Sequence, residues 1–446
     1  MEISHAALLV VERARALIDV ESFLARHRAK DRDFTRKRCL PFDVVMLLVL
    51  QKTIKSIQSH LHGFFAQLTN GAVWDSVTAG AWTQARAKLR HTAYIELNQV
   101  AVLDTVYAPS EPIETWHGHR LVAIDSSTLR LPNNEALFGF FGGHEAANHH
   151  GECGVRVTQA RLSVLYDCLN HIGIDTRIGK FRRGEIDLAT EHFASFRHGD
   201  VVVADRGFAG YLFLAQILAA GGQFVVRCST QSFAAAQTLF KRNENGASIT
   251  VTLSATPSCR VEAKQAGLPL ELRVRFVSVR LPTGDIEVLA TSLLDEKAFP
   301  TEAFLEVYHC RWAIETYYGI LKGRLDLENF TGLTVEAVLQ DIHAAVFLSN
   351  LESVVTRDAA AQLPQPGDNG RLYGAKVNKA VSFHALKDHV IDLLIGKEPV
   401  HEVLLKLCQL FLANPVSIRP KRNPPRQPFS FPRSLHFQKR VKKAGF

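Results

Sequence analysis

Two short apolar runs in the middle of the chain each lead directly into an aspartate. Residues 121–124 precede Asp125, and residues 201–204 precede Asp205. Continuous apolar runs of this length are typical of strands buried on both faces of an α/β sheet. Residues 155–170 and 172–178 alternate instead between apolar and polar, as half-buried strands do. We therefore predict an α/β sheet with both aspartates at strand ends, where open α/β sheets bind their ligands.

A helical pattern later in the chain has two distinct faces. Its apolar face contains Val307, Ile314, Tyr318, Leu321 and Leu325. Its polar face contains Tyr308, Arg311, Glu315 and Lys322, which at about 100° per residue lie within roughly 60° of one another. A carboxylate between a guanidinium and an ammonium suits a site that handles metal and phosphate. The alternative is a plain surface pair of Arg311 and Glu315, worth about 0.2–0.5 kcal/mol.

The first hundred residues show helical patterns separated by turns and a basic run. Helices are expected at 1–24, 42–50, 56–65 and 78–90, the last with Gln84, Arg86 and Lys88 pointing outward. The basic run includes Arg36, Lys37 and Arg38. Short helices with a polar, basic final member fit a helix-turn-helix-like DNA reader, and a helical bundle with a solvated face is the alternative.

Further strands and helices are expected on either side of Glu315. Residues 248–253, 270–279 and 286–291 have strand patterns, with a hairpin turn at 282–284. Residues 333–356 continue as a helix, 362–371 form a linker, and 376–412 form a small helical segment. The tail after it is basic and rich in proline, which suits contact with a phosphate backbone or a solubilising end.

Composition and charge narrow the class of protein. The net charge of +8 and the pI of about 9.1 favour a polyanionic partner, nucleic acid first. The seven cysteines contain no C-x-x-C pair, which fits reduced thiols better than a disulfide framework. The chain opens without the pattern of a signal peptide, and its longest strongly apolar run, 44–50, is too short to cross a bilayer. We expect a soluble, cytoplasmic, nucleoid-associated protein with no membrane contact.

Asp125, Asp205 and Glu315 would repel one another at a common site unless cations lay among them. A hard divalent ion such as Mg²⁺ prefers oxygen ligands and keeps positions for water and phosphate oxygens. Two such ions can promote in-line displacement at phosphorus. The three carboxylates therefore predict metal-dependent phosphodiester chemistry. A zinc site at His144, His149, His150 and Cys153 is rejected, because the spacing of these residues matches no usual zinc pattern.

The chain resembles the insertion-sequence-four family of DDE transposases. The family's Y-x2-R-x3-E-x6-K signature is matched by Tyr308, Arg311, Glu315 and Lys322. The segments Ile124-Asp125-Ser126-Ser127 and Ala204-Asp205-Arg206-Gly207-Phe208 resemble the two aspartate motifs of the family, and the likeness covers about residues 30–355. It implies an RNase H-like catalytic core at 116–229 and 293–356, interrupted by a β-rich insertion at 230–292. A helical DNA-binding domain at 1–115 would precede this core, and a helical segment with a basic tail at 357–446 would follow it.

The resemblance also implies an activity and its partners. Asp125, Asp205 and Glu315 would be catalytic and would bind Mg²⁺, or Mn²⁺ in its place. Contacts to double-stranded DNA, both element ends and target, would come from Tyr308, Arg311, Lys322, Arg206, Arg36, Lys37 and Arg38. A homodimer on DNA would cut and join the ends. The alternatives are a DNA-binding regulator with an inactive core and an RNase H-type nuclease without end specificity.

One feature departs from the family pattern. Some relatives stack a flipped base on a tryptophan of the insertion while forming a DNA hairpin, but this chain has no tryptophan between Asp205 and Arg311. Phe233, Phe240 or Phe276 could stack a base instead, and the residues do not select among them. Whether a hairpin forms is therefore left open.

Overall fold

The computed structural model describes residues 3–36, 39–52, 56–69, 77–147, 153–367 and 372–419. The chain forms two compact units. Unit 1 contains Met1–Pro112, Leu129–Gln159 and Ile320–Phe446, and unit 2 contains Ile113–Thr128 and Ala160–Gly319. Lys37, Arg38, His149, His150 and the tail beyond residue 419, for which predictions were made above, lie outside the described residues.

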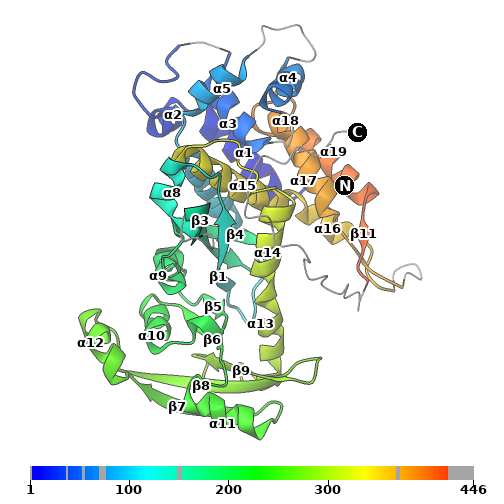
Figure 1. The fold of residues 1–446 in the computed structure, drawn as a ribbon. Helices are drawn as coiled ribbons and strands as arrows, with labels where there is room; N and C mark the ends of the chain where they lie inside the picture. Colours follow the sequence, from blue (N-terminus) through cyan, green and yellow to red (C-terminus); the bar gives the residue numbers. More distant parts are fainter. Residues whose placement is uncertain are drawn as a thin grey trace. The chain divides into compact units, whose positions relative to one another are not determined.

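Unit 1 is largely helical (Figure 1). Its N-terminal helices are α1 (His5–Asp19), α2 (Glu21–His27), α3 (Phe42–Leu50), α4 (Ile57–Leu68), α5 (Ala79–Arg86), α6 (Thr92–Leu97) and α7 (Asp104–Val106), with a π-helical turn at Asn98–Leu103. Later segments add α8 (Glu135–Phe141), α15 (Val335–Val355), α16 (Arg357–Gln362), α17 (Lys379–Asp388), α18 (Val390–Leu394) and α19 (Val400–Ala413). A two-stranded ribbon pairs β10 (Ala375–Lys376) with β11 (Val416–Ser417).

Helix α15 forms the centre of unit 1. Nearly all of its residues are buried, and it packs against α1, α3, α6, α8, α16 and α17. Because it is surrounded, its polar side chains are paired: the Lys379 ammonium and the Ser382 hydroxyl both donate to the Glu352 carboxylate. Short polar residues begin several helices of this unit, as in α4, whose Ser56 side chain accepts from the Ser59 amide.

Arg86 was expected on an outward face and instead lies in the core of unit 1. Its side chain is 4% exposed and its guanidinium pairs with Asp341 at 2.8 Å. It also donates to Gln340 at 2.7 Å and to the carbonyl of Ala337. The prediction was wrong because the partners of Arg86 come from a helix some 250 residues away, which no local pattern reveals.

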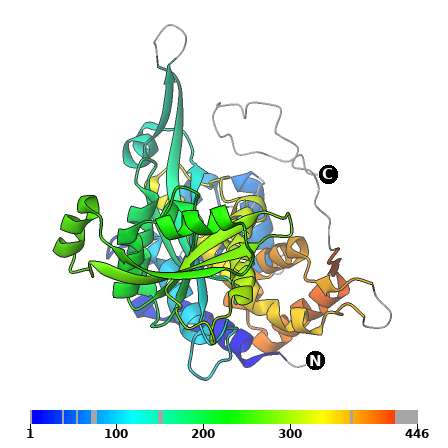
Figure 2. The same cartoon turned by 90° about the horizontal axis from the view of Figure 1, so that it is seen from below.

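Strand β2 (Gly143–Ala147) pairs antiparallel with the first part of β3 (Cys153–Asp167), as Figure 2 shows. His144, which belongs to the rejected zinc pattern, therefore lies in a strand. Gly143 allows the close approach of the two strands, since a Cβ atom there would lie 2.0 Å from the carbonyl oxygen of Val157.

Unit 2 is built on a mixed sheet. Its strands are β1 (Leu121–Arg130), β4 (Ile172–Lys180), β5 (Val201–Ala204), β6 (Gln223–Arg227), β7 (Ser248–Ser254), β8 (Glu271–Arg280) and β9 (Ile286–Thr291), together with the second part of β3. The strand order is β4-β3-β1-β5-β6-β9-β8-β7. Helices α9 (Glu185–Thr190), α10 (Tyr211–Ala219), α11 (Ala234–Arg242), α12 (Pro257–Gln265), α13 (Phe304–Cys310) and α14 (Trp312–Gly323) accompany it, and the boundaries between the units fall within β1, β3 and α14.

The first five strands of this sheet have the RNase H-like arrangement. Strands β3 and β4 are antiparallel, while β1, β5 and β6 run parallel to one another. Strand β5 is buried along its whole length, as its continuous apolar run predicts. The expected fold class, α/β with an RNase H-like core and a helical N-terminal region, is confirmed.

The three strands predicted between the second aspartate and the glutamate are present as β7, β8 and β9. They extend the same sheet through the antiparallel pairing of β9 with β6. Gly284 forms the turn between β8 and β9 with a φ of 93°, which favours glycine. Helix α11 packs against all three strands. Within the described ranges, no helix combines the length and apolarity that crossing a membrane requires.

Candidate active site

Asp125 and Asp205 lie at the same level of two neighbouring parallel strands. The pairing of β1 with β5 ends at Ala123 and Val203, and each aspartate comes two residues after the last residue that its strand pairs with the other. Neighbouring strands are about 4.8 Å apart, so this register points both side chains toward one region. Strand β5 ends before Asp205 as predicted, but β1 continues to Arg130. The expectation that Asp125 ends its strand was wrong, because pairing with β3 extends β1.

The Asp125 carboxylate is held in a half-buried, acidic environment. Its pKa is raised to about 6, first by burial and then by the charges of Glu185 and Glu315, against the Ser126 amide and Arg311, which lower it. The Ser126 amide donates to the carboxylate at 2.8 Å. A carboxyl group with a raised pKa among other acids is one that a bound cation would stabilise in its charged form.

Helix α14 is fastened to β1 beside Asp125. The Tyr318 hydroxyl donates to the main-chain oxygen of Asp125 at 2.8 Å. Burial and the Asp125 charge raise the pKa of Tyr318 well above its ordinary value, which keeps the phenol protonated as a donor. Glu315 precedes Tyr318 by three residues, about one helical turn, so this bond brings its carboxylate into the electrostatic range of Asp125.

Glu315 is itself paired with an arginine. The Arg311 guanidinium donates to its carboxylate at 2.9 Å, and the Glu315 side chain is 37% exposed. Arg311 is 7% exposed and stacks over the ring of Trp312 at 4.4 Å. The pair was considered as a plain surface salt bridge, but its arginine is buried.

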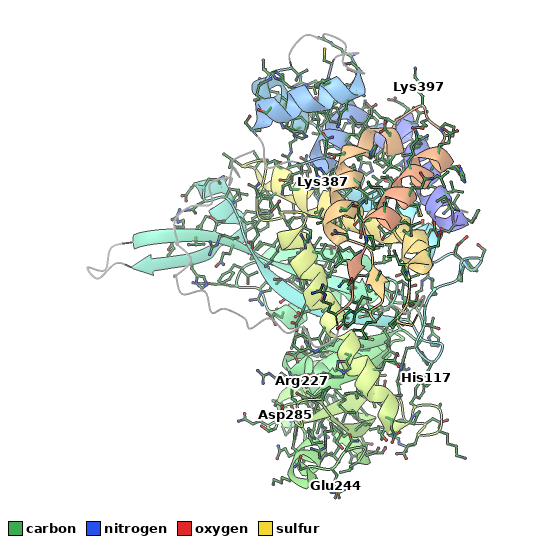
Figure 3. The ribbon with its side chains drawn as sticks, turned by 90° about the vertical axis from the view of Figure 1, so that its right-hand side faces the viewer. His117, Arg227, Glu244, Asp285, Lys387 and Lys397 are labelled. Carbon is green, nitrogen blue, oxygen red and sulfur yellow. The ribbon has the colours of Figure 1, made fainter. Side chains whose placement is uncertain are left out.

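Asp205 faces a second arginine, which sequence reasoning missed. An Arg227 guanidinium nitrogen lies 3.4 Å from the Asp205 carboxylate. Arg227, labelled in Figure 3, ends β6 and also donates to Glu287 on β9 at 2.7 Å. The hydrogen bond to Glu287 is the largest cause that raises the pKa of Arg227, and the charges of Glu287 and Asp205 raise it as well. Arg227 therefore stays cationic. The local signal, an arginine at the end of an apolar run, is too common to have been selected.

A buried hydrogen-bonded chain reaches the main-chain oxygen of Asp125 from β3. Both ring nitrogens of His192 are hydrogen-bonded. Nδ1 lies 2.8 Å from the Asp175 carboxylate, and Nε2 lies 2.9 Å from the Ser163 hydroxyl. The Ser163 hydroxyl also lies 3.4 Å from the main-chain oxygen of Asp125. His192 and Ser163 are 0% and 1% exposed, so this serine is placed to support Asp125 and is closed to a substrate. The three residues lie on separate elements, and their sequence spacing gave no signal.

The remaining predicted DNA-contacting residues lie in different settings. Tyr308 is 5% exposed, whereas Arg206 and Arg36 are exposed. Lys322 belongs to the part of α14 in unit 1, where its ammonium lies 3.7 Å from Glu328. The buried apolar face of the predicted helix is confirmed: Val307, Ile314, Tyr318, Leu321 and Leu325 are all buried.

Two of the three phenylalanines considered for base stacking are partly exposed. Phe233 and Phe240 are half-buried. Phe276 is fully buried, with its ring 5.5 Å from that of Phe233. Phe276 is therefore closed to a base.

The carboxylates of Asp125, Asp205 and Glu315 offer the kind of oxygen atoms that suit a hard cation, but two of these carboxylates are paired with arginines. Carboxylate oxygens are what Mg²⁺ prefers. Among the described residues, no group of three His, Cys, Asp or Glu side chains stands ready to hold a metal ion. Two of the carboxylates instead face guanidinium groups, Arg227 and Arg311, whose positive charge stands where a cation's would be needed.

An RNase H-like core with two aspartates at the same level of neighbouring parallel strands is typical of a class of proteins that act on nucleic acid backbones. Residues 116–351, more than half of the chain, match the family model described as Transposase DDE domain. The chain belongs to this family and is a transposase by family. Asp125, Asp205 and Glu315 all lie inside the matched region.

The chain was also compared with characterised proteins and with solved structures. A search of characterised proteins gives no match. Among solved structures, the chain is similar to the protein in "Cryo-EM structure of piggyBac transposase synaptic complex with hairpin DNA (SNHP)", at 9% identity and a TM-score of 0.43, covering 92% of this chain and 83% of that one. The family assignment rests on the DDE domain match.

Proposed function

We propose that this protein is a transposase of the insertion-sequence-four type, which cuts the DNA ends of its own element and joins them to a target. The observation that carries the proposal is the level placement of Asp125 and Asp205 on adjacent strands, with Glu315 on a helix bonded to Asp125. The Y-R-E-K residues belong to this proposal, as do the three carboxylates as the catalytic set.

Asp125, Asp205 and Glu315 would hold Mg²⁺, or Mn²⁺ in its place. When bound, such ions lower the pKa of a water and neutralise charge on the phosphate oxygens. Asp125 must lose its proton to take part, which near neutral pH it does, since its pKa is raised only to about 6. Arg227 and Arg311 would keep the carboxylates oriented before loading and then turn to phosphate oxygens, which a planar guanidinium can bind in pairs.

The reaction would occur in two displacements at phosphorus. Water first attacks a phosphodiester at the element end and frees a 3′-hydroxyl; that hydroxyl then attacks a phosphodiester of the target. Tyr308, Arg311 and Lys322 would position phosphates near the scissile bond. Trp312, 42% exposed beside Arg311, is the first residue of α14.

The rest of the chain would bind DNA and bring two ends together. We propose the helical segment 1–115, with Arg36, Lys37 and Arg38, and the exposed Arg206 as DNA contacts. The insertion 230–292 and the basic segment after residue 357 would add to them. The core would comprise 116–229 and 293–356, and the active form would be a homodimer on double-stranded DNA in the cytoplasm, at the nucleoid.

A cleavage assay tests the proposal. Element-end DNA is incubated with the full chain and Mg²⁺, and in parallel with DNA whose end sequence has been exchanged. A transposase cuts the first and spares the second. Equal cutting of both would indicate a nuclease without end specificity, and binding without nicking would indicate a regulator with an inactive core.

The Glu315→Gln variant assigns the chemistry to the site. We expect DNA binding within about twofold of wild type, because one neutral amide replaces one carboxylate, while cleavage falls at least about a thousandfold, by analogy with the loss of other essential catalytic groups. Gel-shift and cleavage assays on the same duplex measure the two effects. Glu306→Gln, on the preceding helix α13, serves as the matched control. Wild-type turnover by Glu315→Gln contradicts the role given to Glu315.

A further inference from the structure

Unit 1 contains a cavity of about 510 Å³ that the proposed chemistry does not use. Its walls come from the end of α3, from α4 and α17, and from the turn that follows α14. Phe64 and Phe383 form apolar parts of the wall. The polar parts come from amide, imidazole and charged side chains. All of these residues belong to unit 1, so the cavity is complete within it.

The cavity has an excess of positive charge. Lys52, Lys379, Lys387 and Arg324 line it, against Asp326 and Asp388. Lys379 is neutralised by Glu352 at 2.6 Å, and Asp388 is shared with His384 at 3.2 Å. Lys52, Lys387 and Arg324 therefore remain as three cations against the two carboxylates of the cavity, Asp326 and Asp388.

Lys52 has a structural role. Its side chain is buried, and its ammonium donates to the main-chain oxygens of Asp326 and Leu327 at 3.0 and 3.2 Å. These bonds hold the turn after α14, in which Asp326 has a φ of 49°. Burial lowers the pKa of Lys52 to about 8, so near neutral pH it adds a positive charge to the cavity wall.

Lys387, labelled in Figure 3, is placed differently. Within the described residues, its ammonium makes one hydrogen bond, a long one of 3.3 Å to the main-chain oxygen of Lys52, and no ion pair within 4.0 Å. Lys387 is half-buried. An ammonium carries three donors, and leaving donors unused where water has restricted access is costly. Burial accordingly lowers the pKa of Lys387, against the charges of Asp326 and Asp388. An anion in the cavity would satisfy the donors that the described residues leave open.

Two other groups suit an anion with a polar substituent. Arg324 is exposed at the cavity, and no ion pair or hydrogen bond of its side chain occurs among the described residues. The side-chain oxygen of Asn329 is buried without a hydrogen-bond partner there. Gln51 and Gln67 add a bonded amide pair at 2.8 Å. Guanidinium and ammonium groups together are what binds phosphate oxygens in proteins.

We propose that this cavity is a phosphate-binding site, in which Lys387 contacts the phosphate directly and Arg324 contacts it from the rim. The phosphate comes either from a DNA backbone or from a free nucleotide; both present the same oxygens. The site is distinct from the carboxylate set, which lies in unit 2, and it does not require that the chain cleave DNA.

Isothermal titration of the full chain, without metal, tests the proposal with three probes: inorganic phosphate, deoxyadenosine monophosphate and a DNA duplex. The variant is Lys387→Gln. Its matched control is Lys397→Gln, which changes an exposed lysine after α18, also labelled in Figure 3. Circular dichroism and a thermal melt establish that both variants are folded. Arg324→Gln, at an exposed position, gives a second variant in case Lys387→Gln does not fold.

We expect Lys387→Gln to weaken binding of at least one probe by about tenfold or more, because it removes a charge-assisted contact, while Lys397→Gln changes it less than about twofold. Loss confined to the duplex identifies a backbone phosphate, and loss with the small probes identifies a free one. Equal weakening by both variants, or no change with any probe for folded Lys387→Gln and Arg324→Gln, overturns the proposal. Because no cleavage is measured, failure here leaves the transposase proposal untouched, and the reverse also holds.

Discussion

At the scale of single residues, the candidate site is defined by charges that oppose one another. Asp125 is buried near Glu185 and Glu315, so its pKa is raised to about 6. Asp205 and Glu315 are instead balanced by Arg227 and Arg311. Without a metal, ion pairs at Asp205 and Glu315 therefore lower the cost of gathering these acids, and below about pH 6 protonation of Asp125 lowers it further.

The charge on Asp125 should destabilise the metal-free protein above pH 6. Its native pKa lies above its unfolded value of 3.8, so the native state binds the proton more tightly and this carboxyl's contribution to stability falls as pH rises from about 4 to 6. Asp125→Asn removes the charge and keeps an acceptor for the Ser126 amide. At pH 8 with a chelator, we expect the variant to be more stable by up to about 2–3 kcal/mol.

Urea unfolding of both proteins at pH 4 and at pH 8 measures this difference. The advantage of Asp125→Asn should shrink to a small fraction of this at pH 4, where wild-type Asp125 is protonated in the native state and partly protonated in the unfolded state. Asp104→Asn, at an exposed site in α7, is the control. An advantage of equal size at both pH values would contradict the assignment of the effect to Asp125.

The buried pair of Arg86 and Asp341 should be a strong point of stability in unit 1. Their side chains are 5% and 0% exposed, and Thr331 adds hydrogen bonds to Asp341. Arg86→Met leaves a buried carboxylate without its cation, so we expect a loss of about 3–5 kcal/mol. The exposed Arg32→Met should change stability by less than about 0.5 kcal/mol.

Denaturant unfolding of Arg86→Met, Asp341→Leu and the double variant completes a cycle. The double variant should be more stable than Arg86→Met, since it removes the unpaired charge as well as its partner. Additive losses would mean that the two groups do not act as a pair.

At the scale of elements, α14 and β1 act as one support for the carboxylates. The main-chain oxygen of Asp125 accepts from Tyr318 on α14, and the Ser163 hydroxyl lies 3.4 Å from it. Behind Ser163, the chain continues through His192 to Asp175. Hydroxyl donors from two elements thus fix the backbone position from which the Asp125 carboxylate projects.

Tyr318→Phe should impair this support without touching DNA. It removes one buried hydrogen bond, which costs about 1–2 kcal/mol of stability. We expect a lower kcat for cleavage, with KM for the DNA ends nearly unchanged, because the variant displaces Asp125 and Glu315 relative to each other. Cleavage kinetics over a range of DNA concentrations separate the two constants. Tyr373→Phe, at a 40% exposed position, is the control. A raised KM with unchanged kcat would point to a role in DNA binding instead.

At the scale of the whole molecule, charge is distributed unevenly along the chain. Residues 420–446 contain Lys421, Arg422, Arg426, Arg433, Lys439, Arg440, Lys442 and Lys443 and no acidic residue. These eight charges equal the net charge of +8, so the rest of the chain is close to neutral. Attraction to DNA at long range therefore depends heavily on this segment.

Replacing these eight residues by glutamine should weaken DNA binding and its dependence on salt. Each phosphate contact adds about 0.9 to the slope of log K against log salt, so losing even three contacts should reduce the slope by nearly 3. Gel-shift titrations from 50 to 200 mM salt measure the slope. Over this range, three phosphate contacts change the affinity by roughly fortyfold. A control variant in which the residues of 420–446 are shuffled, with all eight basic residues retained, should keep the salt slope of the wild type. An unchanged slope in the glutamine variant would remove this segment from the DNA contacts.

Local patterns determined most of the elements of this protein. The apolar runs predicted β5 and the helix α3 to the residue, and alternation predicted β7, β8 and β9. The periodicity around Glu315 predicted which face of its helix is buried. These features depend on neighbours within a few residues, where backbone geometry and burial repeat with a fixed period. The acidic residues of the candidate site could be chosen for the same reason, since each follows or lies on such an element.

Only the tertiary structure decided which groups face those residues. Arg227 and Glu287 come from different strands, and Ser163, His192 and Asp175 join across separate elements. Arg86 turned inward because Asp341 lies opposite it, and β1 continued past Asp125 because β3 pairs with it. In each case the deciding energy is that of a buried charge or a main-chain group finding its partner. Such partners are brought together by the packing of distant segments, so their identity is not written in any local stretch of sequence.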